Sequence, residues 1–391
     1  MRVAYVCADP GVPVFGQKGC SIHVQEVIRA LTAHGARVNL FATRIDGTRP
    51  PGLEAVTLHA LPGTRGTTVE ARERAAHQAN APLRLALEKA GAFDLVYERH
   101  SIWSVEGMRF ARDRGIPGVL EVNAPLVDEQ AEHRTLCDRA SALLAAKGAF
   151  EAASTIVAVS KGTAAYVRRF IDGSRKLFVV PNGVDPSRFR EPRGPRRREA
   201  DDSFTVGFVG SLKPWHGLPI LARAFGELHA EKARSRLLVV GDGPERLRTE
   251  QWLDEHGLRD VARFTGAVEP DRIPALLASM DAAVAPYPAL PGFYFSPLKV
   301  LEYMAAELPV VASRIGQLED VIADGTTGLL CRPGDPRALS AQLQRLRDDP
   351  DLCLRLGSAA RAAVIERHTW RAATSRILAL AGLAAPAEAG H

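Results

Sequence analysis

The 391-residue sequence lacks the signatures of several common classes of protein. Its five cysteines are scattered and form no CxxC pair, which argues against a zinc site and indicates reduced thiols in a cytoplasmic protein. No apolar run approaches the roughly 18 residues of a membrane span, and the start of the sequence has no signal-peptide pattern. The dinucleotide-binding pattern GxGxxG is also missing, which argues against a dehydrogenase.

Aromatic residues are few, at 6%, and no block of Lys and Arg is interleaved with them, so we expect no nucleic-acid binding. No Asp-rich motif follows a predicted strand, so we expect no metal requirement. The net charge of +5 suits anionic ligands and leaves peripheral membrane contact open, although no strongly amphipathic, Lys-rich helix requires it. Apolar residues make up 46% of a chain longer than one core needs, which predicts two packed domains.

Short β-branched runs alternate with longer amphipathic stretches, such as Ile22–His34, Thr68–Ala90 and Ala131–Ala152. This alternation predicts an α/β protein whose parallel sheets carry helices on both faces. The expected strands are Val3–Cys7, Val38–Phe41, Leu95–Tyr97, Val119–Val122, Thr155–Val159 and Leu177–Val180, then Thr205–Val209, Leu237–Val240, Ala262–Thr265, Ala282–Ala285 and Val310–Ala312. Ligands of such sheets bind beyond the carboxyl ends of the strands.

The stretch Glu191–Asp202 (EPRGPRRREADD) interrupts this alternation. Its proline, glycine and charged residues indicate either a linker or a long surface loop. As a linker, it separates a first domain over residues 1–190 from a second domain over residues 203–369.

The segment Phe295–Ala306 (FSPLKVLEYMAA) carries the most information about function. Ser296 is a good N-cap and Pro297 suits the first helical position, so we expect a helix to begin here. Its free amides would form an anion site, and Lys299 opposes the helix dipole unless an anion lies in front of it. Glu302 shares a helix face with Lys299, so a solvent-exposed ion pair on an ordinary helix is the alternative.

Two further loops in the second half follow predicted strands. Gly210–Gly217 (GSLKPWHG) carries Lys213 and His216, and Gly241–Pro244 (GDGP) leads from the next strand into a helix. Glycine lets backbone approach a ligand closely, but such turns are common in any α/β protein. Each loop therefore predicts either a ligand contact or an ordinary connection.

In the first half, Asp9–Ser21 (DPGVPVFGQKGCS) is a long loop after the first strand. If Ser21 caps the next helix, Gly19 and His23 lie at that helix's N-terminus. The residues leave open whether this segment is a phosphate loop or a connector.

Together these segments resemble glycosyltransferase family 4, the retaining enzymes of the GT-B fold, over nearly the whole chain. The pair SPLKxxEYMA and GSxKPWHG resembles a variant subgroup. The motifs, in the family's order, are VVPNGVD (Val179–Asp185), FVGSLKPWHGL (Phe208–Leu218), VVGDGPE (Val239–Glu245), FSPLKVLEYMA (Phe295–Ala305), LPVVAS (Leu308–Ser313) and DGTTGLL (Asp324–Leu330). The resemblance implies two Rossmann-like domains facing across a cleft, with the last helix, over about 370–391, crossing back to the first domain.

The resemblance also implies metal-independent, retaining transfer of a sugar from a nucleotide sugar to a hydroxyl acceptor, with no resident cofactor. The default donor is a UDP-linked sugar, and the acceptor is a small molecule, a lipid-linked group or a saccharide. The catalytic candidates are Lys213, Lys299, Arg99 and His100. The donor-binding candidates are Gly19, Ser211, His216, Gly241, Asp242, Phe264, Thr265, Ser296, Pro297, Leu298 and Glu302, with Glu302 on the ribose. The acceptor-binding candidates are His23, Glu121 and Asn123, although a buried structural role for Asn123 is equally consistent with the sequence.

The sequence departs from the family's pattern at two places. The first of the family's paired glutamates falls on Tyr294, so the sugar cannot be carried over from the usual motif. The usual Arg and Lys after the first strand of the second domain fall on Ser211 and His216, and Lys213 lies between them. Loss of Lys299 is expected to lower kcat by about 10²–10³, the range for one preorganised charge.

Three alternatives share these motifs or the architecture. A GT-B-fold epimerase would convert a nucleotide sugar with no acceptor present. A degenerate partner protein would bind a nucleotide sugar without turnover, and an interaction scaffold would bind none. The sequence names neither the sugar, the base, the acceptor nor the oligomeric state.

Overall fold

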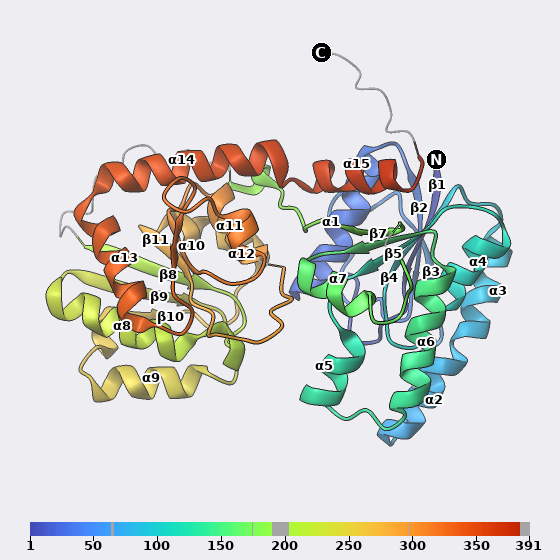
Figure 1. Ribbon diagram of the computed structural model, residues 1–391, viewed down its shortest axis with the longest axis horizontal. Helices are drawn as coiled ribbons and strands as arrows, with labels where there is room; N and C mark the ends of the chain where they lie inside the picture. The colour runs from blue at the N-terminus through green and yellow to red at the C-terminus, as the bar shows by residue number, and fades with distance from the viewer. Residues whose placement is uncertain (64–65, 174, 190–202, 297, 384–391) are drawn as a thin grey trace, which may run out of the picture. The chain divides into compact units, whose positions relative to one another are not determined.

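The computed structural model describes residues 1–63, 66–173, 175–189, 203–296 and 298–383. Internal contacts divide the chain into two units, each with its own sheet (Figure 1). The first unit contains Met1–Asn182, Tyr294–Ser296 and the chain from Trp370, and the second contains Gly183–Phe293 and Pro297–Thr369. The expected linker at 191–202 and the candidate Pro297 lie outside the described residues.

The first unit has a seven-stranded sheet in the order β3-β2-β1-β4-β5-β6-β7, with all pairs parallel. Its buried strands are built from runs such as VAYVC and TIVA, which suit a sheet covered on both faces. The strands are β1 (Arg2–Cys7), β2 (Arg37–Ala42), β3 (Thr57–Ala60), β4 (Leu95–Arg99), β5 (Gly118–Val122), β6 (Thr155–Ala158) and β7 (Leu177–Val179). The helices are α1 (Gly19–Ala33), α2 (Val69–Gln78), α3 (Asn80–Ala90), α4 (Glu106–Asp113), α5 (Leu126–His133), α6 (Arg139–Ala152), α7 (Lys161–Val167) and α15 (Trp370–Leu380).

The second unit has a six-stranded parallel sheet in the order β10-β9-β8-β11-β12-β13. The strands are β8 (Phe204–Val209), β9 (Ser235–Val240), β10 (Ala262–Phe264), β11 (Ala282–Ala285), β12 (Val310–Ser313) and β13 (Leu329–Cys331). The helices are α8 (Leu218–Glu231), α9 (Arg246–Glu255), α10 (Ile273–Ala278), α11 (Leu298–Ala305), α12 (Leu318–Val321), α13 (Pro336–Asp348) and α14 (Pro350–Arg367), with short 3-10 turns that include η1 (Pro186–Phe189) and η2 (Pro214–His216).

Helix α15 completes the first unit by packing on α1. The Nε2 atom of His34 lies 2.7 Å from the hydroxyl of Ser375, and the indole of Trp370 meets His23 edge-on with 5.1 Å between ring centroids. The predicted return of the last helix is therefore confirmed, as is the α/β class with two Rossmann-like sheets. The cleft between the two domains stays a prediction.

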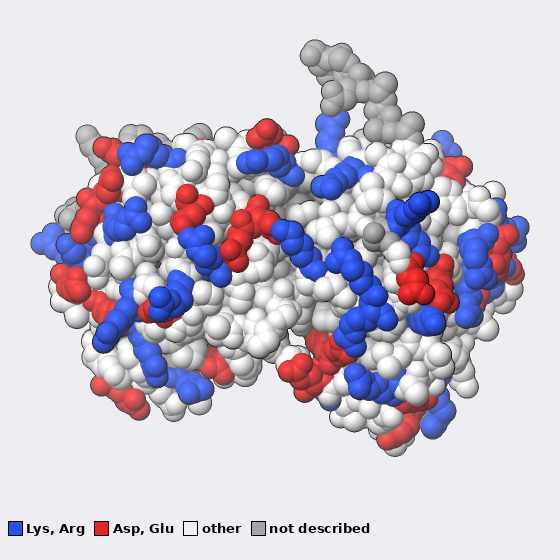
Figure 2. All heavy atoms as spheres, viewed as in Figure 1, with Lys and Arg blue, Asp and Glu red and all other residues white. Residues whose placement is uncertain are grey.

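Surface properties agree with the ordinary composition. On the face drawn in Figure 2, basic and acidic side chains are interspersed. No helix in the described part of the chain has the length and apolar character needed to cross a bilayer. All five cysteines are free thiols.

Candidate active site

The order of strands in the second unit marks where a ligand would bind. From β8 the chain winds outward through β9 to β10, and from β11 it winds the other way through β12 to β13. The loops after β8 and β11 therefore flank the point where the winding reverses, which is the usual ligand crevice of such sheets. These are the loop Gly210–Gly217 and the segment that leads into α11, both singled out from the sequence.

The loops after β8 and β9 are hydrogen-bonded to each other. The amide of Leu212 donates to the carbonyl of Asp242 (2.9 Å), and the amide of Glu245 donates back to the carbonyl of Leu212 (3.0 Å). Gly241 has a φ of 131°, and a Cβ there would overlap the carbonyl oxygen of Gly210. The glycine at 241 is thus required by packing between the loops, whatever its role toward a donor.

Lys299 lies in the first turn of α11, and its ammonium nitrogen is buried. Among the described residues it has no hydrogen-bond partner. The Nζ atom lies 4.3 Å from the ring centroid of Phe208 and 5.7 Å from that of Tyr287. Burial lowers the pKa of Lys299 to about 7, and the nearby carboxylate of Glu302 opposes this effect only in part. An unpaired buried cation is costly, so this position favours an anionic ligand.

Tyr303, which the sequence reasoning missed, holds α11 against β8. Its buried hydroxyl accepts a hydrogen bond from the amide of Val209 (2.8 Å) and donates to the carbonyl of the same residue (3.2 Å). Tyr303 follows Lys299 by four residues and therefore shares its helix face. That spacing was the available signal, although nothing in the sequence indicates the bond to β8.

His216 lies beside the same rings, with its centroid 6.1 Å from that of Phe208 and 5.9 Å from that of Tyr287. Its Nδ1 atom contacts the carbonyl oxygen of Ser211, so Nδ1 carries the hydrogen. Burial and the charge of Lys299 lower the pKa of His216 to about 3, which keeps the ring neutral. Ser211 itself is exposed, and Lys213 is partly exposed on the same loop.

The other donor candidates of the second unit make local contacts. The carboxylate of Glu302 lies 3.8 Å from Nη1 of Arg188 in η1, an ion pair that the sequence did not suggest. Asp242 accepts from the amide of Gly243 (2.7 Å) and from Arg246 (3.2 Å). The Thr265 hydroxyl donates to the carbonyl of Gly266 (2.8 Å), the guanidinium of Arg259 lies over the ring of Phe264, and Leu298 is the first residue of α11.

In the first unit the winding reverses between β1 and β4. His23 of α1 and Glu121 of β5 are each 2% exposed at this point and bind each other, with 3.0 Å between Nε2 and Oε1. Asn182 Oδ1 lies 3.1 Å from the same Nε2. Nδ1 of His23 lies 3.1 Å from Nη1 of Arg99, a group that can only donate. His23 thus lies between the two side chains, with Nδ1 facing the guanidinium of Arg99 and Nε2 facing the carboxylate of Glu121.

This buried chain of contacts assigns different roles to the first-unit candidates. Although burial alone would raise it, the pKa of Glu121 is held below its usual range by His23 and Arg99. The bond to His23 is the one hydrogen bond of the Arg99 side chain among the described residues. Of the set, Arg99 is thus the residue with donors to spare, while His23 and Glu121 hold it in place.

His100 differs from the partly exposed Arg99 that precedes it. His100 is 3% exposed, its ring lies 4.9 Å from that of Phe150, and neither ring nitrogen has a partner within the described residues. Burial, followed by the charge of Arg99, lowers the pKa of His100 to about 4. The ring is therefore neutral and packed in the core. The buried Nδ2 of Asn123 likewise has no partner among the described residues.

The prediction that Ser21 caps the helix after β1 is wrong. Helix α1 begins at Gly19, and its N-cap is Lys18, which offers no side-chain hydrogen bond. Ser21 lies inside the first turn with its hydroxyl buried and, within the described residues, unpartnered. Gly19 does lie at the helix N-terminus, as expected. Ser296, the other serine that the sequence suggested as an N-cap, belongs to the first unit, and its buried hydroxyl has no hydrogen-bond partner among the described residues.

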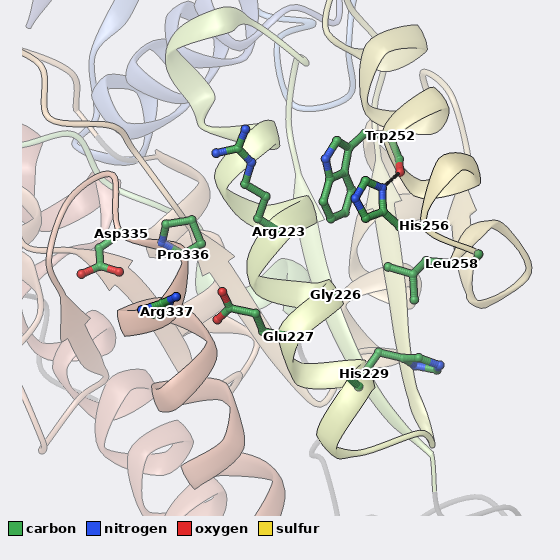
Figure 3. A pocket seen from close by; sticks show the side chains of 12 residues that line it. Arg223, Gly226, Glu227, His229, Trp252, His256, Leu258, Asp335, Pro336 and Arg337 are labelled. Atoms are coloured by element: carbon green, nitrogen blue, oxygen red, sulfur yellow. Dashed lines mark hydrogen bonds between the residues drawn. The ribbon is translucent and has the colours of Figure 1, made fainter.

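A separate pocket of about 930 Å³ lies among helices of the second unit (Figure 3). Trp252 stacks on His256 there, with 3.9 Å between ring centroids. Its lining residues are Arg223, Gly226, Glu227, His229, Ala230, Trp252, His256, Gly257, Leu258, Asp335, Pro336 and Arg337. None comes from the loops after β8, β9 or β11, so this pocket is not part of the candidate active site.

Comparison with known families gives two matches along the chain. Residues 18–188 match the model described as "Glycosyltransferase Family 4", and residues 203–349 match the model described as "Glycosyl transferases group 1". The first match covers every strand of the first sheet except β1, and the second covers all strands of the second sheet.

Individual proteins agree with these matches. The 2-deoxystreptamine glucosyltransferase of Streptomyces kanamyceticus is 32% identical over 209 residues, which cover 51% of this chain and 50% of that enzyme. The chain thus spans about half the length of this relative. A D-inositol 3-phosphate glycosyltransferase of Streptomyces scabiei is 27% identical over 90% of this chain and 83% of its own. The structure of Anabaena HepE in complex with UDP and glucose superimposes with a TM-score of 0.75 at 20% identity, over 98% of this chain and 100% of that one.

Proposed function

Because the chain belongs to the glycosyltransferases, we propose that it transfers a sugar from a nucleotide sugar to a hydroxyl acceptor, with retention of configuration and without a metal. The observation that carries the proposal is the buried, unpartnered ammonium of Lys299, at the crevice where the winding of the second sheet reverses. A diphosphate is the anion that a nucleotide sugar would bring to it. The complex of HepE with UDP and glucose supports a UDP-linked donor.

In the proposed reaction the acceptor oxygen bonds to the anomeric carbon while the bond from that carbon to the diphosphate oxygen breaks. The electron pair leaves with the diphosphate, and the acceptor's proton passes to a phosphate oxygen. Lys299, Lys213 and the first amides of α11 stabilise the charge that grows on the leaving group. Arg99, held by His23, would contact the transferred sugar or the acceptor.

The names of the two relatives support a small, hydroxyl-rich acceptor. Free thiols at all five cysteines support a reducing, cytoplasmic setting.

The decisive test is a thermal-shift panel of UDP, GDP, ADP, dTDP and their sugar conjugates, followed by turnover with the winning donor. A ligand at 100 times its Kd stabilises a protein by about 2.7 kcal/mol, which is easily measured. We expect one base to stand out, activity that survives EDTA, and a product with the anomeric configuration of the donor. No shift with any nucleotide would refute the proposal, and conversion of the donor without acceptor would indicate an epimerase.

A further inference from the structure

Before any donor binds, the side-chain nitrogen of Lys299 lies in a buried environment that disfavours its charged form. Its buried Nζ has no acceptor among the described residues, and the two nearest rings belong to Phe208 and Tyr287. The nitrogen also packs against backbone, since a Cβ on Gly210 would lie 2.9 Å from it. Folded proteins rarely leave a buried charge unpaired, and a buried amine usually loses its proton instead.

The groups that face Lys299 do not supply the missing anion. On its own helix, Glu302 lies 3.8 Å from Arg188, and the hydroxyl of Tyr303 is bonded to Val209. From the loop after β8 comes His216, whose pKa is lowered to about 3 by burial, by Lys299 and by Lys213, so its ring is neutral. From the loop after β11 comes Tyr287, whose pKa is raised by burial, so its phenol stays protonated. Burial, opposed only in part by the carboxylate of Glu302, lowers the pKa of Lys299 to about 7.

We propose that the donor's diphosphate puts a proton on Lys299, so that above neutral pH the free enzyme holds an amine and the complex holds an ammonium. The inference rests on the proposed function, because it assumes that the diphosphate lies at this crevice. The amine's lone pair forms the new N–H bond, and the proton comes from a hydronium ion or a buffer acid in the solvent, whose bond to that hydrogen breaks and which keeps the electron pair. Donor binding and proton uptake are then one linked event at this side chain.

The sign of the pH dependence follows from this linkage. Below about pH 7 Lys299 is already protonated in the free enzyme, so donor affinity is independent of pH. Above that value each binding event must also take up a proton, so the Kd rises by up to about tenfold per pH unit. An ammonium that is always charged would give no such rise.

Calorimetric titration with UDP-glucose, or with the nucleotide sugar that wins the thermal-shift panel, measures the proton count directly. The titration is repeated in buffers of different ionisation enthalpy, at about pH 6 and about pH 8, and the slope gives the protons taken up. UDP alone is unsuitable, because a terminal phosphate titrates near pH 6. We expect close to one proton per site at the higher pH and close to none at the lower.

Two variants assign the proton to this side chain. Lys299→Arg keeps a permanent charge and is expected to bind the donor with no proton uptake. Lys299→Met is expected to bind at least tenfold more weakly, also without uptake. The matched controls Lys213→Met and His216→Asn change the neighbouring loop and should keep the proton count of the wild type.

Binding by the wild type with no uptake at about pH 8 overturns the inference and leaves the proposed function intact. Uptake that persists in Lys299→Met, or that disappears in His216→Asn alone, overturns it as well. Failure of every nucleotide sugar to bind removes the proposed function and the inference with it.

Discussion

Lys299 and Glu98 are both buried ionisable side chains, and burial disfavours the charged form of each. It lowers the pKa of Lys299 to about 7 and raises the pKa of Glu98 to about 7. Glu98 accepts a hydrogen bond from the Ser104 hydroxyl, and its other oxygen has no partner in the described part of the chain. It alternates along β4 with Tyr97 and Arg99, so it faces the opposite side of the sheet from them. Of these two buried ionisable groups, only Lys299 therefore lies at the candidate active site.

Replacing Lys299 by Met should separate stability from activity. Met fills a similar volume without a charge, so we expect the free energy of unfolding to rise by about 1–2 kcal/mol, the cost of an unsatisfied buried polar group. We expect kcat to fall by about 10²–10³. Urea unfolding and initial rates measure the two effects, and a loss of activity under about tenfold would remove Lys299 from the catalytic set.

Replacing Glu98 by Gln should change the pH dependence of stability. Because the folded-state pKa is raised, the contribution of Glu98 is fully present below about pH 4.5 and is lost as the pH rises through about 7. Gln still accepts from Ser104 but cannot ionise. We expect the variant to gain roughly 2–3 kcal/mol over the wild type at about pH 8 and to gain little at about pH 5, since one pKa unit is worth about 1.4 kcal/mol.

The exposed ion pair of Arg44 and Asp46 provides the control for this experiment. Asp46→Asn should change stability by less than about 0.5 kcal/mol at either pH. A gain in Glu98→Gln that is equal at both pH values would contradict the assigned burial effect.

At the scale of elements, the strands were predicted well because burial on both faces selects β-branched runs. Eleven runs were expected, and each lies on an observed strand, as with Ala282–Ala285. The two strands that were missed, β3 and β13, are the outermost in their sheets. In β3 no residue is fully buried, so the sequence TLHA carries no apolar signal.

Two of the long helical patterns are interrupted in the structure, and each interruption coincides with a contact to a distant part of the chain. The pattern over 68–90 forms α2 and α3, because Asn80 at the break caps α4: its Oδ1 accepts from the amide of Val105 (2.9 Å). The pattern over 131–152 is interrupted before α6, where Glu73 accepts from the amides of Cys137 and Asp138 (2.9 Å each). Contacts between residues 25 or 64 positions apart cannot be predicted from local periodicity.

The same limit applied to the candidate site. The sequence placed Gly241 and His216 on loops that follow apolar strand runs, and Lys299 in the first turn of a helix. The chain from Arg99 through His23 to Glu121 joins two strands and a helix, so no local pattern announced it. Asn182 and Trp370, which also contact His23, come from still more distant segments.

The packing of the loop after β9 gives a prediction with a built-in control. Gly241→Ala adds a methyl group against the Gly210 carbonyl, at a φ of 131° that an L side chain rarely adopts. We expect it to lower the free energy of unfolding by more than about 3 kcal/mol and to abolish nucleotide binding. Gly257 has a φ of 66°, and a methyl group there would meet no atom within 4 Å, so Gly257→Ala should cost only about 1–2 kcal/mol. If the two variants lose similar amounts of unfolding free energy, the loop after β9 can accommodate a methyl group at position 241 without strain.

At the scale of the whole molecule, the first unit is completed from the far end of the chain. Residues 1–182 supply its sheet, and α15 returns from the second unit to pack on α1. Trp370 is 8% exposed and its ring meets that of His23 edge-on. Loss of Trp370 would therefore expose His23, the side chain that links Arg99 to Glu121.

Deleting the chain from Trp370 onward should therefore damage the first unit and spare the second. We expect faster amide hydrogen exchange in α1 and β1, with protection of β8 to β11 unchanged. The point variant Trp370→Ala should show the same pattern with a smaller loss, about 3–5 kcal/mol, which is typical of a buried aromatic side chain. Uniform loss of protection across both sheets would mean that the units unfold as one.

The return of α15 also affects the order in which the first unit can fold during synthesis. The ribosome delivers the chain from its N-terminus at about 5–20 residues per second. The first sheet has emerged long before the helix that seals it, and the whole second unit must be made in between. During that interval α15 is not yet present to cover the face of α1 on which it packs. We therefore expect the first unit to complete its packing only after α15 has been synthesised.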